Sequence, residues 1–199
     1  MVSVALASSL AQSAGGALLV DLTGDVPAVL GMPDVATPGV GEWLAAGAGV
    51  PADALARLEV AGPAGLRVLV RGAAGGEAGR AGVLAALLAA EQRPVVVDCG
   101  TEPSGVGLAV AQAAHTSLLV VRPCFLALRR AQQSLLRPTG VVVVREPGRV
   151  LGAADVEAVV KAPVVAEVPV DEAVARAVDA GTLAQRVPRS LHRSLRRVA

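Results

Sequence analysis

The chain has 199 residues and a formal net charge of +1, with 53% hydrophobic and 18% charged residues. This balance excludes an intrinsically disordered chain and gives no general argument for nucleic acid or for an acidic partner. The length predicts a single α/β domain over residues 1–199, and no stretch reaches the roughly 20 apolar residues that span a bilayer.

The first fourteen residues resemble a secretory signal only superficially. The apolar run over Val4–Ala7 is followed by small residues, but no basic region precedes it, and Ser8 and Ser9 interrupt it. Secretory signals combine a positively charged start with a continuous apolar stretch. We therefore expect a helix over Val2–Gln12 that belongs to the folded domain.

Cysteine usage points to a reducing compartment. Cys99 and Cys124 are not in CxxC spacing, and neither has a histidine beside it, so no metal site is expected from them. Two cysteines in a chain of this size fit a cytoplasmic protein.

Short runs rich in valine and leucine predict parallel strands, because they are apolar on both faces, as strands covered by helices on both sides must be. The predicted strands are Ala17–Asp21, Arg67–Arg71, Val95–Asp98, Ser117–Arg122, Val141–Arg145 and Val164–Val168.

Helix-like segments lie between most of these strands. They are predicted at Val83–Ala90, Val106–Ala114, Leu126–Leu136, Ala153–Val160 and Glu172–Ala180. The looser stretch from Gly24 to Gly65 is expected to decorate one edge of the sheet, with short helices at Val40–Ala46 and Ala52–Arg57. Strands alternating with helices predict a doubly wound, mostly parallel sheet in a three-layer αβα arrangement.

Two predicted strands end on an aspartate, Asp21 and Asp98. Ligands bind at the carboxyl ends of parallel strands, and carboxylates there suit a hydrated magnesium ion. The alternative is that each aspartate caps the turn that follows it, as aspartate often does. Two aspartates in neighbouring βα units favour a site.

The glycine-rich segment Gly72–Arg80 follows a predicted strand and precedes a helix, where a phosphate-binding loop would lie. Its glycines fit neither G-x-G-x-x-G nor a loop ending in Gly-Lys-Ser/Thr, so a flexible surface connection is the better interpretation. His115 stands alone before a strand and is expected at the surface.

The turn Pro169, Val170 and Asp171 leads from the last predicted strand into a helix. Pro169 is expected to end the strand, Asp171 to cap the helix, and Gly181 to end it. The turn is expected at the same edge of the sheet as Asp21 and Asp98, within reach of a purine ring. A simple βα turn explains the same residues equally well.

The C-terminal residues 187–199 predict a basic amphipathic helix. Four arginines lie off its apolar stripe, at positions suited to contact acidic lipid or a phosphate backbone: Arg189, Arg193, Arg196 and Arg197. A surface helix that packs on the sheet and keeps its basic face in water is the more usual explanation.

In order along the chain, these segments resemble the MinD/ParA superfamily of deviant-Walker P-loop ATPases, which includes CpaE-like proteins. The helix Val2–Gln12 and strand Ala17–Asp21 resemble the first helix of that family and the strand after it. Val95–Asp98 resembles its Walker B strand, and Pro163–Gly181 resembles its strand, Pro-x-Asp turn and helix. The resemblance covers nearly the whole chain.

The resemblance implies a magnesium-dependent ATP site and nucleotide-driven homodimerisation. Asp98 would act on magnesium through water, Asp21 would help to position the attacking water, and Pro169, Val170 and Asp171 would line the base. Family roles include chromosome or plasmid partitioning, division-site placement and organelle positioning. Where many relatives carry a second acidic residue, this chain has Thr23, with Asp25 further on.

The chain departs from the family at its start, where the family has a first strand and a lysine-bearing glycine-rich loop. Both would precede Met1, and the single lysine, Lys161, is expected at the opposite edge of the sheet. We therefore expect this polypeptide to be weak or inactive in catalysis, since phosphoryl transfer depends on that loop.

Three hypotheses follow from these observations. The chain is a ParA/MinD-like ATPase whose sequence starts too late, or it is a pseudo-ATPase that binds or positions a partner, its central gap closed by re-paired strands or by a partner's strand. The third and weaker hypothesis is a receiver-like domain phosphorylated on Asp21 or Asp98.

Overall fold

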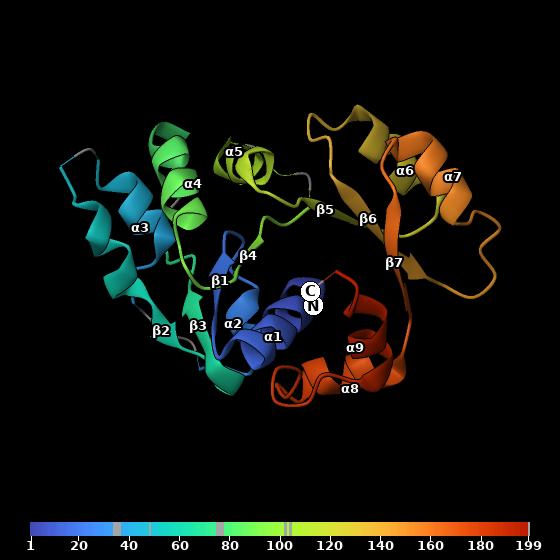
Figure 1. The fold of residues 1–199 in the computed structure, drawn as a ribbon, viewed down its shortest axis with the longest axis horizontal. Coiled ribbons are helices and arrows are strands. Elements are labelled where there is room, and N and C mark those ends of the chain that lie inside the picture. The colour runs from blue at the N-terminus through green and yellow to red at the C-terminus, as the bar shows by residue number, and fades with distance from the viewer. Residues whose placement is uncertain (34–36, 48, 75–77, 102, 104, 199) are drawn as a thin grey trace.

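The computed structural model describes residues 1–33, 37–47, 49–74, 78–101, 103 and 105–198 (Figure 1). The described strands are β1 Ala17–Asp21, β2 Val60–Ala61, β3 Leu66–Leu69, β4 Val95–Asp98, β5 Leu118–Val121, β6 Gly140–Arg145 and β7 Val164–Pro169. The described α-helices are α1 Val2–Ala14, α2 Val26–Val29, α3 Val40–Ala45, α4 Ala81–Ala89, α5 Gly105–Ala113, α6 Phe125–Gln133, α7 Ala153–Val160, α8 Glu172–Asp179 and α9 Arg189–Leu195. Short 3₁₀ turns are η1 Ala52–Ala54, η2 Ala56–Leu58, η3 Pro63–Gly65 and η4 Ala78–Arg80.

The predicted α/β class with mostly parallel strands is confirmed, but the strands form two sheets. The first has the order β2-β3-β1-β4 and the second has the order β5-β6-β7. All described pairs are parallel except β2 with β3. The predicted single sheet is therefore divided between β4 and β5, because no described strand pairs with both of them.

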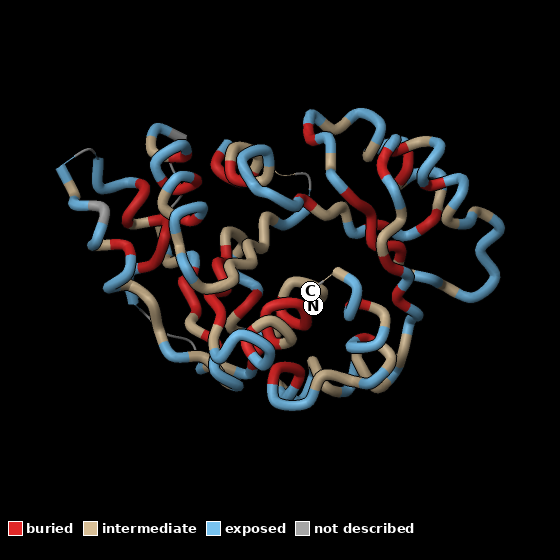
Figure 2. The backbone as a smooth tube through the Cα atoms, viewed as in Figure 1, coloured by how far each residue is buried: buried red, intermediate tan, exposed pale blue. Residues whose placement is uncertain are grey.

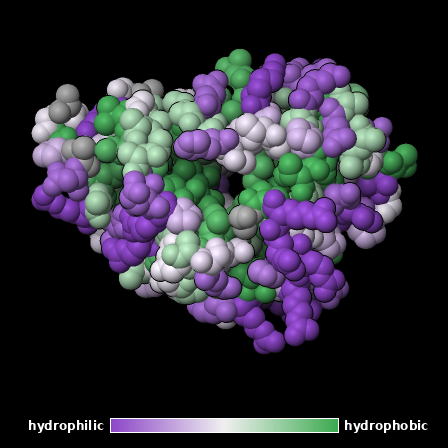
Figure 3. Space-filling model, in the orientation of Figure 1, coloured by the Kyte–Doolittle hydropathy of each residue, from purple (hydrophilic) through white to green (hydrophobic). Residues whose placement is uncertain are grey.

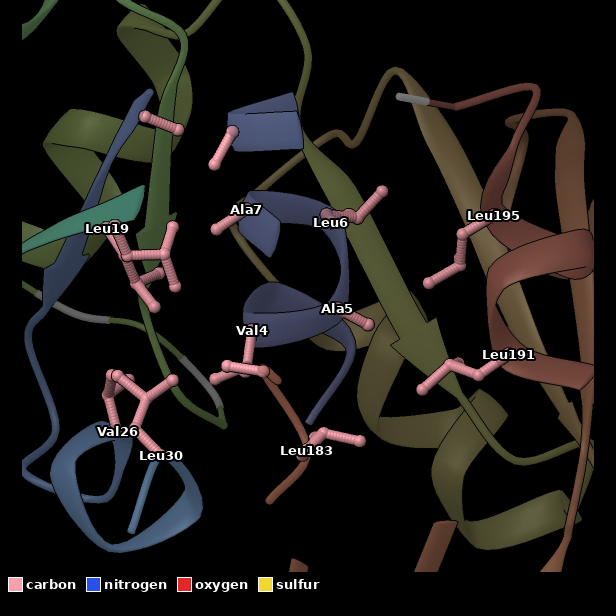
Figure 4. Close-up of a cluster of buried hydrophobic side chains, with 14 of the residues drawn as sticks. Val4, Ala5, Leu6, Ala7, Leu19, Val26, Leu30, Leu183, Leu191 and Leu195 are labelled. Atoms are coloured by element: carbon pink, nitrogen blue, oxygen red, sulfur yellow. The ribbon is translucent and has the colours of Figure 1, made fainter. Parts of the chain in front are cut away.

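Helix α1 lies between the two sheets on one face (Figures 1 and 4). Its four consecutive residues Val4 to Ala7 are all buried, with exposed fractions of 0–7%. In Figure 4 they face Leu19 of β1 on one side and Leu191 and Leu195 of α9 on the other. The same cluster includes Val142 of β6, so α1 joins the cores of both sheets.

The opposite face of each sheet has its own helices. Helices α3, α4 and α5 bury Trp43, Leu84 and Val106 over the first sheet. Helices α6 and α7 bury Leu128 and Val156 over the second sheet. Together with α1 and α9 on the first face, this arrangement is the predicted three-layer αβα organisation (Figure 1).

Some element boundaries differ from the prediction for identifiable reasons. β3 ends at Leu69 rather than Arg71, because the carbonyls of Val70 and Arg71 accept hydrogen bonds from the first amides of α3. β7 extends to Pro169, because a proline is tolerated at the end of an edge strand. The predicted helix Ala52–Arg57 is the pair of 3₁₀ turns η1 and η2, and the short strand β2 escaped prediction.

Helix α9 is shorter than the predicted basic helix over residues 187–199. It spans Arg189–Leu195, and its Leu191 and Leu195 are buried at 2% exposure against α1 and β7. The four tail arginines are all exposed. The packing of this helix on the protein is as expected, and the contact of its arginines with acidic lipid or a phosphate backbone stays a prediction. No helix in the described part of the chain has the length and apolar character needed to cross a membrane.

Two glycines hold the ends of α2 and α8 together. Gly181 has a left-handed φ of 62°, and the amides after α8 donate back to Ala177 and Val178, so it ends the helix as predicted. Gly31 has a φ of 65°, and a Cβ atom there would lie 2.4 Å from the Gly181 carbonyl oxygen.

Replacement of Gly31 by alanine is expected to destabilise the protein through both backbone strain and overlap with Gly181. The matched control is Gly148→Ala, where φ is 76° and nothing lies within 4 Å of the position that the added methyl group would occupy. Urea unfolding should show a loss of about 1–2 kcal/mol for the control. Overpacking should cost Gly31→Ala about 1–3 kcal/mol more. Equal losses would contradict the close contact.

Leu191→Ala is expected to lower the free energy of unfolding by about 2–5 kcal/mol, because it empties a buried position between α9 and α1. Arg193→Ala on the exposed face should change it by less than about 0.5 kcal/mol. Chemical denaturation of both variants checks the assignment. A larger loss of unfolding free energy for Arg193→Ala than for Leu191→Ala would show that the basic face, rather than the apolar stripe, stabilises the packing of this helix.

Candidate functional site

Asp21 and Asp98 lie side by side at the carboxyl ends of neighbouring parallel strands. They are register partners in the pairing of β1 with β4. The turns that follow are in contact, since a Cβ atom on Gly100 would lie 2.4 Å from Thr23 Cγ2. The structure therefore brings both predicted aspartates to one edge of one sheet.

The Asp21 carboxylate is buried and holds the turn after β1. Its Oδ1 accepts hydrogen bonds from the amides of Thr23 at 2.9 Å and Gly24 at 2.8 Å, and from the Thr23 hydroxyl at 3.0 Å. Its Oδ2 accepts from the Val26 amide, at the start of α2, at 3.1 Å. Asp21 itself is 0% exposed. In this arrangement its oxygens stabilise the turn that presents Asp25.

The Asp98 carboxylate faces a pocket of about 380 Å³ at the same edge. The Ser3 hydroxyl of α1 donates to its Oδ2 at 2.5 Å, and the Gly100 amide donates to its Oδ1 at 3.0 Å. Asp25 and the apolar residues Val26 and Val29 of α2 also line the pocket. Asp98 and Asp25 are thus the acidic groups that the structure places around this space.

Cys99 follows Asp98 and is not a reactive thiol. Burial, followed by the charge of Asp98, raises the pKa of the Cys99 thiol to about 11. A thiol with that pKa is almost wholly protonated at neutral pH and is a poor nucleophile. The described residues contain no group of His, Cys, Asp and Glu side chains arranged to hold a metal ion through three or more such ligands.

The start of the glycine-rich segment is held by an internal carboxylate. Glu42 of α3 accepts hydrogen bonds from the Gly39 amide at 2.7 Å and from the Ala73 and Ala74 amides at 2.8 Å each. A Cβ atom on Gly72 would lie 1.8 Å from Glu42 Oε2, so only glycine fits there. Residues 75–77 of this segment lie outside the described residues. The described amides bind the chain's own carboxylate rather than an incoming anion.

The Pro169–Asp171 turn lies at the far side of the second sheet. β5 and β6 stand between β7 and the first sheet. Asp171 caps α8 by accepting from the Ala173 amide at 2.8 Å, and the Ser190 hydroxyl donates to its other oxygen. These two bonds, with Ser190 the larger influence, lower the pKa of Asp171. Val170 is 59% exposed and is free to contact a ligand.

Lysine and histidine are remote from the aspartate pair. Lys161 ends α7 just before β7 begins, at the amino edge of the second sheet as predicted. His115 is exposed, in the connection before β5. A groove beside β7 contains Arg193, Arg196 and Arg197 of the tail, separate from the aspartate pocket.

An ion-pair cluster of the described structure lies at the opposite edge of the first sheet. Arg93 holds Glu59 at 2.8 Å and Glu91 at 2.9 Å, and Arg67 approaches Glu59 at 3.3 Å. The hydrogen bonds from Arg93 lower the pKa of Glu91 to about 2. This cluster joins the beginnings of β2, β3 and β4.

Sequence reasoning missed three groups at or near the site: Ser3, the role of Asp25 beside Asp98, and Glu42. Ser3 and Asp98 are 95 positions apart, and no sequence spacing connects them. The Glu42 contact had a partial signal, because a glutamate three residues after a helix-starting position is typical of a capping box.

Comparison with solved structures shows that the chain has the ParA/MinD P-loop NTPase-like fold. A ParA family ATPase from Chlorobium tepidum TLS superposes with a TM-score of 0.79 at 19% identity, covering 98% of this chain and 88% of the other. The MinC:MinD cell division protein complex from Aquifex aeolicus superposes with a TM-score of 0.76 at 18% identity, covering 99% of this chain and 88% of the other. MinD complexed with Mg-ADP from Pyrococcus horikoshii OT3 superposes with a TM-score of 0.71 at 18% identity, covering 96% of this chain and 85% of the other. No protein-family model and no curated protein matches the sequence.

Glu42 predicts a pH dependence of stability. Hydrogen bonds from the Gly39 amide first, and then from Ala74 and Ala73, lower the pKa of Glu42 from 4.5 to about 2. Because the folded pKa lies below the unfolded one, the contribution to stability is complete above about pH 4.5 and is lost as the pH falls toward 2. Urea unfolding between pH 5 and pH 2.5 should therefore show a steeper loss in the natural chain than in Glu42→Gln.

The control for this measurement is Glu172→Gln, which changes an exposed glutamate at the start of α8. It should retain the steep loss of the natural chain. Parallel curves for the natural chain and Glu42→Gln would contradict the assignment of Glu42 to the loop amides.

Proposed function

We propose that this chain is a ParA/MinD-like, nucleotide-dependent positioning or partitioning protein whose site is the pocket at the carboxyl end of β4. The observation that carries the proposal is Asp98, which faces this pocket beside Asp25 in a chain with the ParA/MinD fold. In open α/β sheets, ligands bind outside the carboxyl ends of the strands. The cytoplasm is the compartment that this function requires.

The acidic residues of the pocket fit magnesium. Carboxylate oxygens and water are the ligands that magnesium prefers, usually one or two carboxylates with several waters. Asp98 would hold the ion through water, with Asp25 on the other side of the pocket and the Ser3 hydroxyl orienting the Asp98 oxygen. When bound, magnesium would neutralise phosphate charge.

The roles of the other predicted site residues follow from their contacts. The family resemblance gives Asp21 the positioning of the attacking water. The Asp21 oxygens are engaged by backbone amides, so we propose that Asp21 acts by holding the turn that carries Asp25. Pro169, Val170 and Asp171 would line the base of a nucleotide that reaches across from the first sheet. Beside these turns, Arg71 donates to the Thr23 carbonyl at 3.5 Å.

A protein partner or a homodimer fits the same function. The structural neighbour from Aquifex aeolicus is a MinD protein in complex with MinC. By this likeness, we propose that the chain works by binding another protein or a second copy of itself under nucleotide control.

A second candidate function is a pseudo-ATPase scaffold, which keeps the fold and binds a partner without turnover. Two observations favour it. Lys161 lies at the amino edge of the second sheet, whereas Asp98 lies at the carboxyl edge of the first, and Glu42 accepts hydrogen bonds from the described amides of the glycine-rich segment. The described residues therefore include carboxylates suited to a metal ion, but the described lysine and the described amides of the glycine-rich segment are not placed to bind phosphate.

Calorimetric titration with Mg-ATP tests the first proposal against the second. We expect Mg-ATP to bind, and we expect EDTA to weaken this binding at least about tenfold. The substitution Asp98→Asn should weaken it by a similar factor. The bound ATP should release little phosphate. Asp179→Asn removes an exposed carboxylate at the end of α8 and should leave binding unchanged.

Absence of Mg-ATP binding at millimolar concentration would overturn the first proposal and leave the scaffold. Binding that survives Asp98→Asn would place the nucleotide elsewhere. Rapid phosphate release would contradict the scaffold.

A further inference from the structure

A groove of about 580 Å³ lies at the outer edge of the second sheet, between β7 and the C-terminal helix α9. β7 supplies one wall through residues 164–167. It is the last strand in the order β5-β6-β7, and in the described structure it pairs with β6 alone. The other wall is the end of α9 and the turn after it, with Arg193, Ser194, Arg196 and Arg197. The groove is separate from the acidic pocket at the end of β4.

The α9 wall of the groove is basic. Helix α9 has both buried and exposed residues (Figure 2), and hydrophilic side chains gather over α8 and α9 (Figure 3). Arg193, Arg196 and Arg197 are exposed, and their spacing of three and four residues brings them close together. None of the three is in an ion pair with a described acidic side chain. Glu167 in the opposite wall already faces Arg145 of β6 at 3.6 Å. The groove therefore offers three guanidinium groups to an incoming anion.

The β7 wall is a strand edge with main-chain groups that face away from the sheet. The Val170 amide donates to the Arg145 carbonyl of β6. Because main-chain groups alternate between the two sides of a strand, Val168 also faces β6, and the amide and carbonyl of Glu167 face the outer side. Pro169 has no amide hydrogen and limits the edge at its carboxyl end. A strand edge of this kind pairs with an extended peptide.

We propose that this groove binds an acidic, extended segment of a partner protein, which lies along β7 with its carboxylates against the arginines of α9. The proposal rests on the partner binding proposed above and names the chemistry of the partner. The groove includes residues 164–167 and Pro169 limits the edge, so the segment that fits is about four or five residues long. The half-buried Val165 in the same wall favours an apolar residue between the acidic ones.

Two other anionic partners fit the groove less well. A helix that binds a membrane surface inserts its apolar face into the lipid, but Leu191 and Leu195 of α9 are buried against the protein at 2% exposure. A nucleic acid has no alternating main-chain donors and acceptors to pair with the free edge at Glu167, so only the arginines would bind it. An acidic peptide uses both walls of the groove.

A fluorescein-labelled peptide Glu-Val-Asp-Val-Glu is the probe, and its uncharged analogue Gln-Val-Asn-Val-Gln is the matched control. Binding is measured by fluorescence anisotropy of the peptide with the whole chain. We expect the control peptide to bind at least about tenfold more weakly, because it lacks the carboxylates. Hydrogen exchange of the Glu167 amide should slow at least about threefold when the acidic peptide is bound.

Variants of the chain locate the site independently. The double substitution Arg193→Glu and Arg196→Glu reverses two charges of the groove and should weaken binding of the acidic peptide at least about tenfold. Arg189→Glu changes an exposed arginine of the same helix that does not line the groove, and it should leave binding unchanged. Glu167→Gln removes the acidic group of the β7 wall and should tighten binding about threefold, a gain that damage to the fold would not produce.

Four results would overturn the proposal. The first is no binding of the acidic peptide up to about 1 mM, and the second is equal weakening by Arg189→Glu and by the double substitution. The third is tighter binding to phosphatidylserine vesicles or to a DNA duplex than to the peptide, which would assign the arginines to lipid or to nucleic acid. The fourth is a dimer that the peptide dissociates, which would assign the groove to a second copy of this chain. None of these readouts uses nucleotide, so a failure here is distinguishable from a failure of the Mg-ATP titration.

Discussion

The packing of α1 between the two sheets is the contact on which the rest of the structure depends. Val4, Leu6 and their neighbours touch the first sheet through Leu19 and the C-terminal helix through Leu191 and Leu195 (Figure 4). No described strand pairs with both β4 and β5, so this apolar cluster connects the two halves of the molecule. It also fixes Ser3 beside Asp98, so the helix that joins the cores also orients the acidic group of the candidate site.

The unpaired edges explain why the strand burial is uneven. Valine-rich strands covered on both faces normally lie inside a sheet. A buried backbone group without a partner costs about 1–3 kcal/mol. The residues of β4 are only half-buried, so its edge backbone groups lie closer to the surface than those of β1.

Sequence alone predicted six of the seven described strands and most of the described helices, because their periodicity and composition are local properties. Ala17–Asp21 and Val95–Asp98 were predicted at their observed bounds. The division of the sheet was not resolved by composition, since β4 and β5 have the composition of interior strands whether or not they are paired. Asp21 shows the same limit for the site, because a single strand-ending aspartate favours a turn cap, and only its pairing with Asp98 in the neighbouring unit favoured a ligand site. Only its contacts with Gly24 and Val26 assign it to the turn. The meeting of Ser3 with Asp98 depends on tertiary packing.

The carboxyl end of β4 is proposed as an acidic metal and nucleotide site around Asp98. Crystals grown with manganese and ATP test this assignment directly through the anomalous signal of manganese. We expect one peak in the pocket between Asp98 and Asp25, with water between the ion and the Asp98 carboxylate. A peak at another acidic cluster, such as Glu59 and Glu91, or no peak in crystals that contain bound ATP, would contradict it.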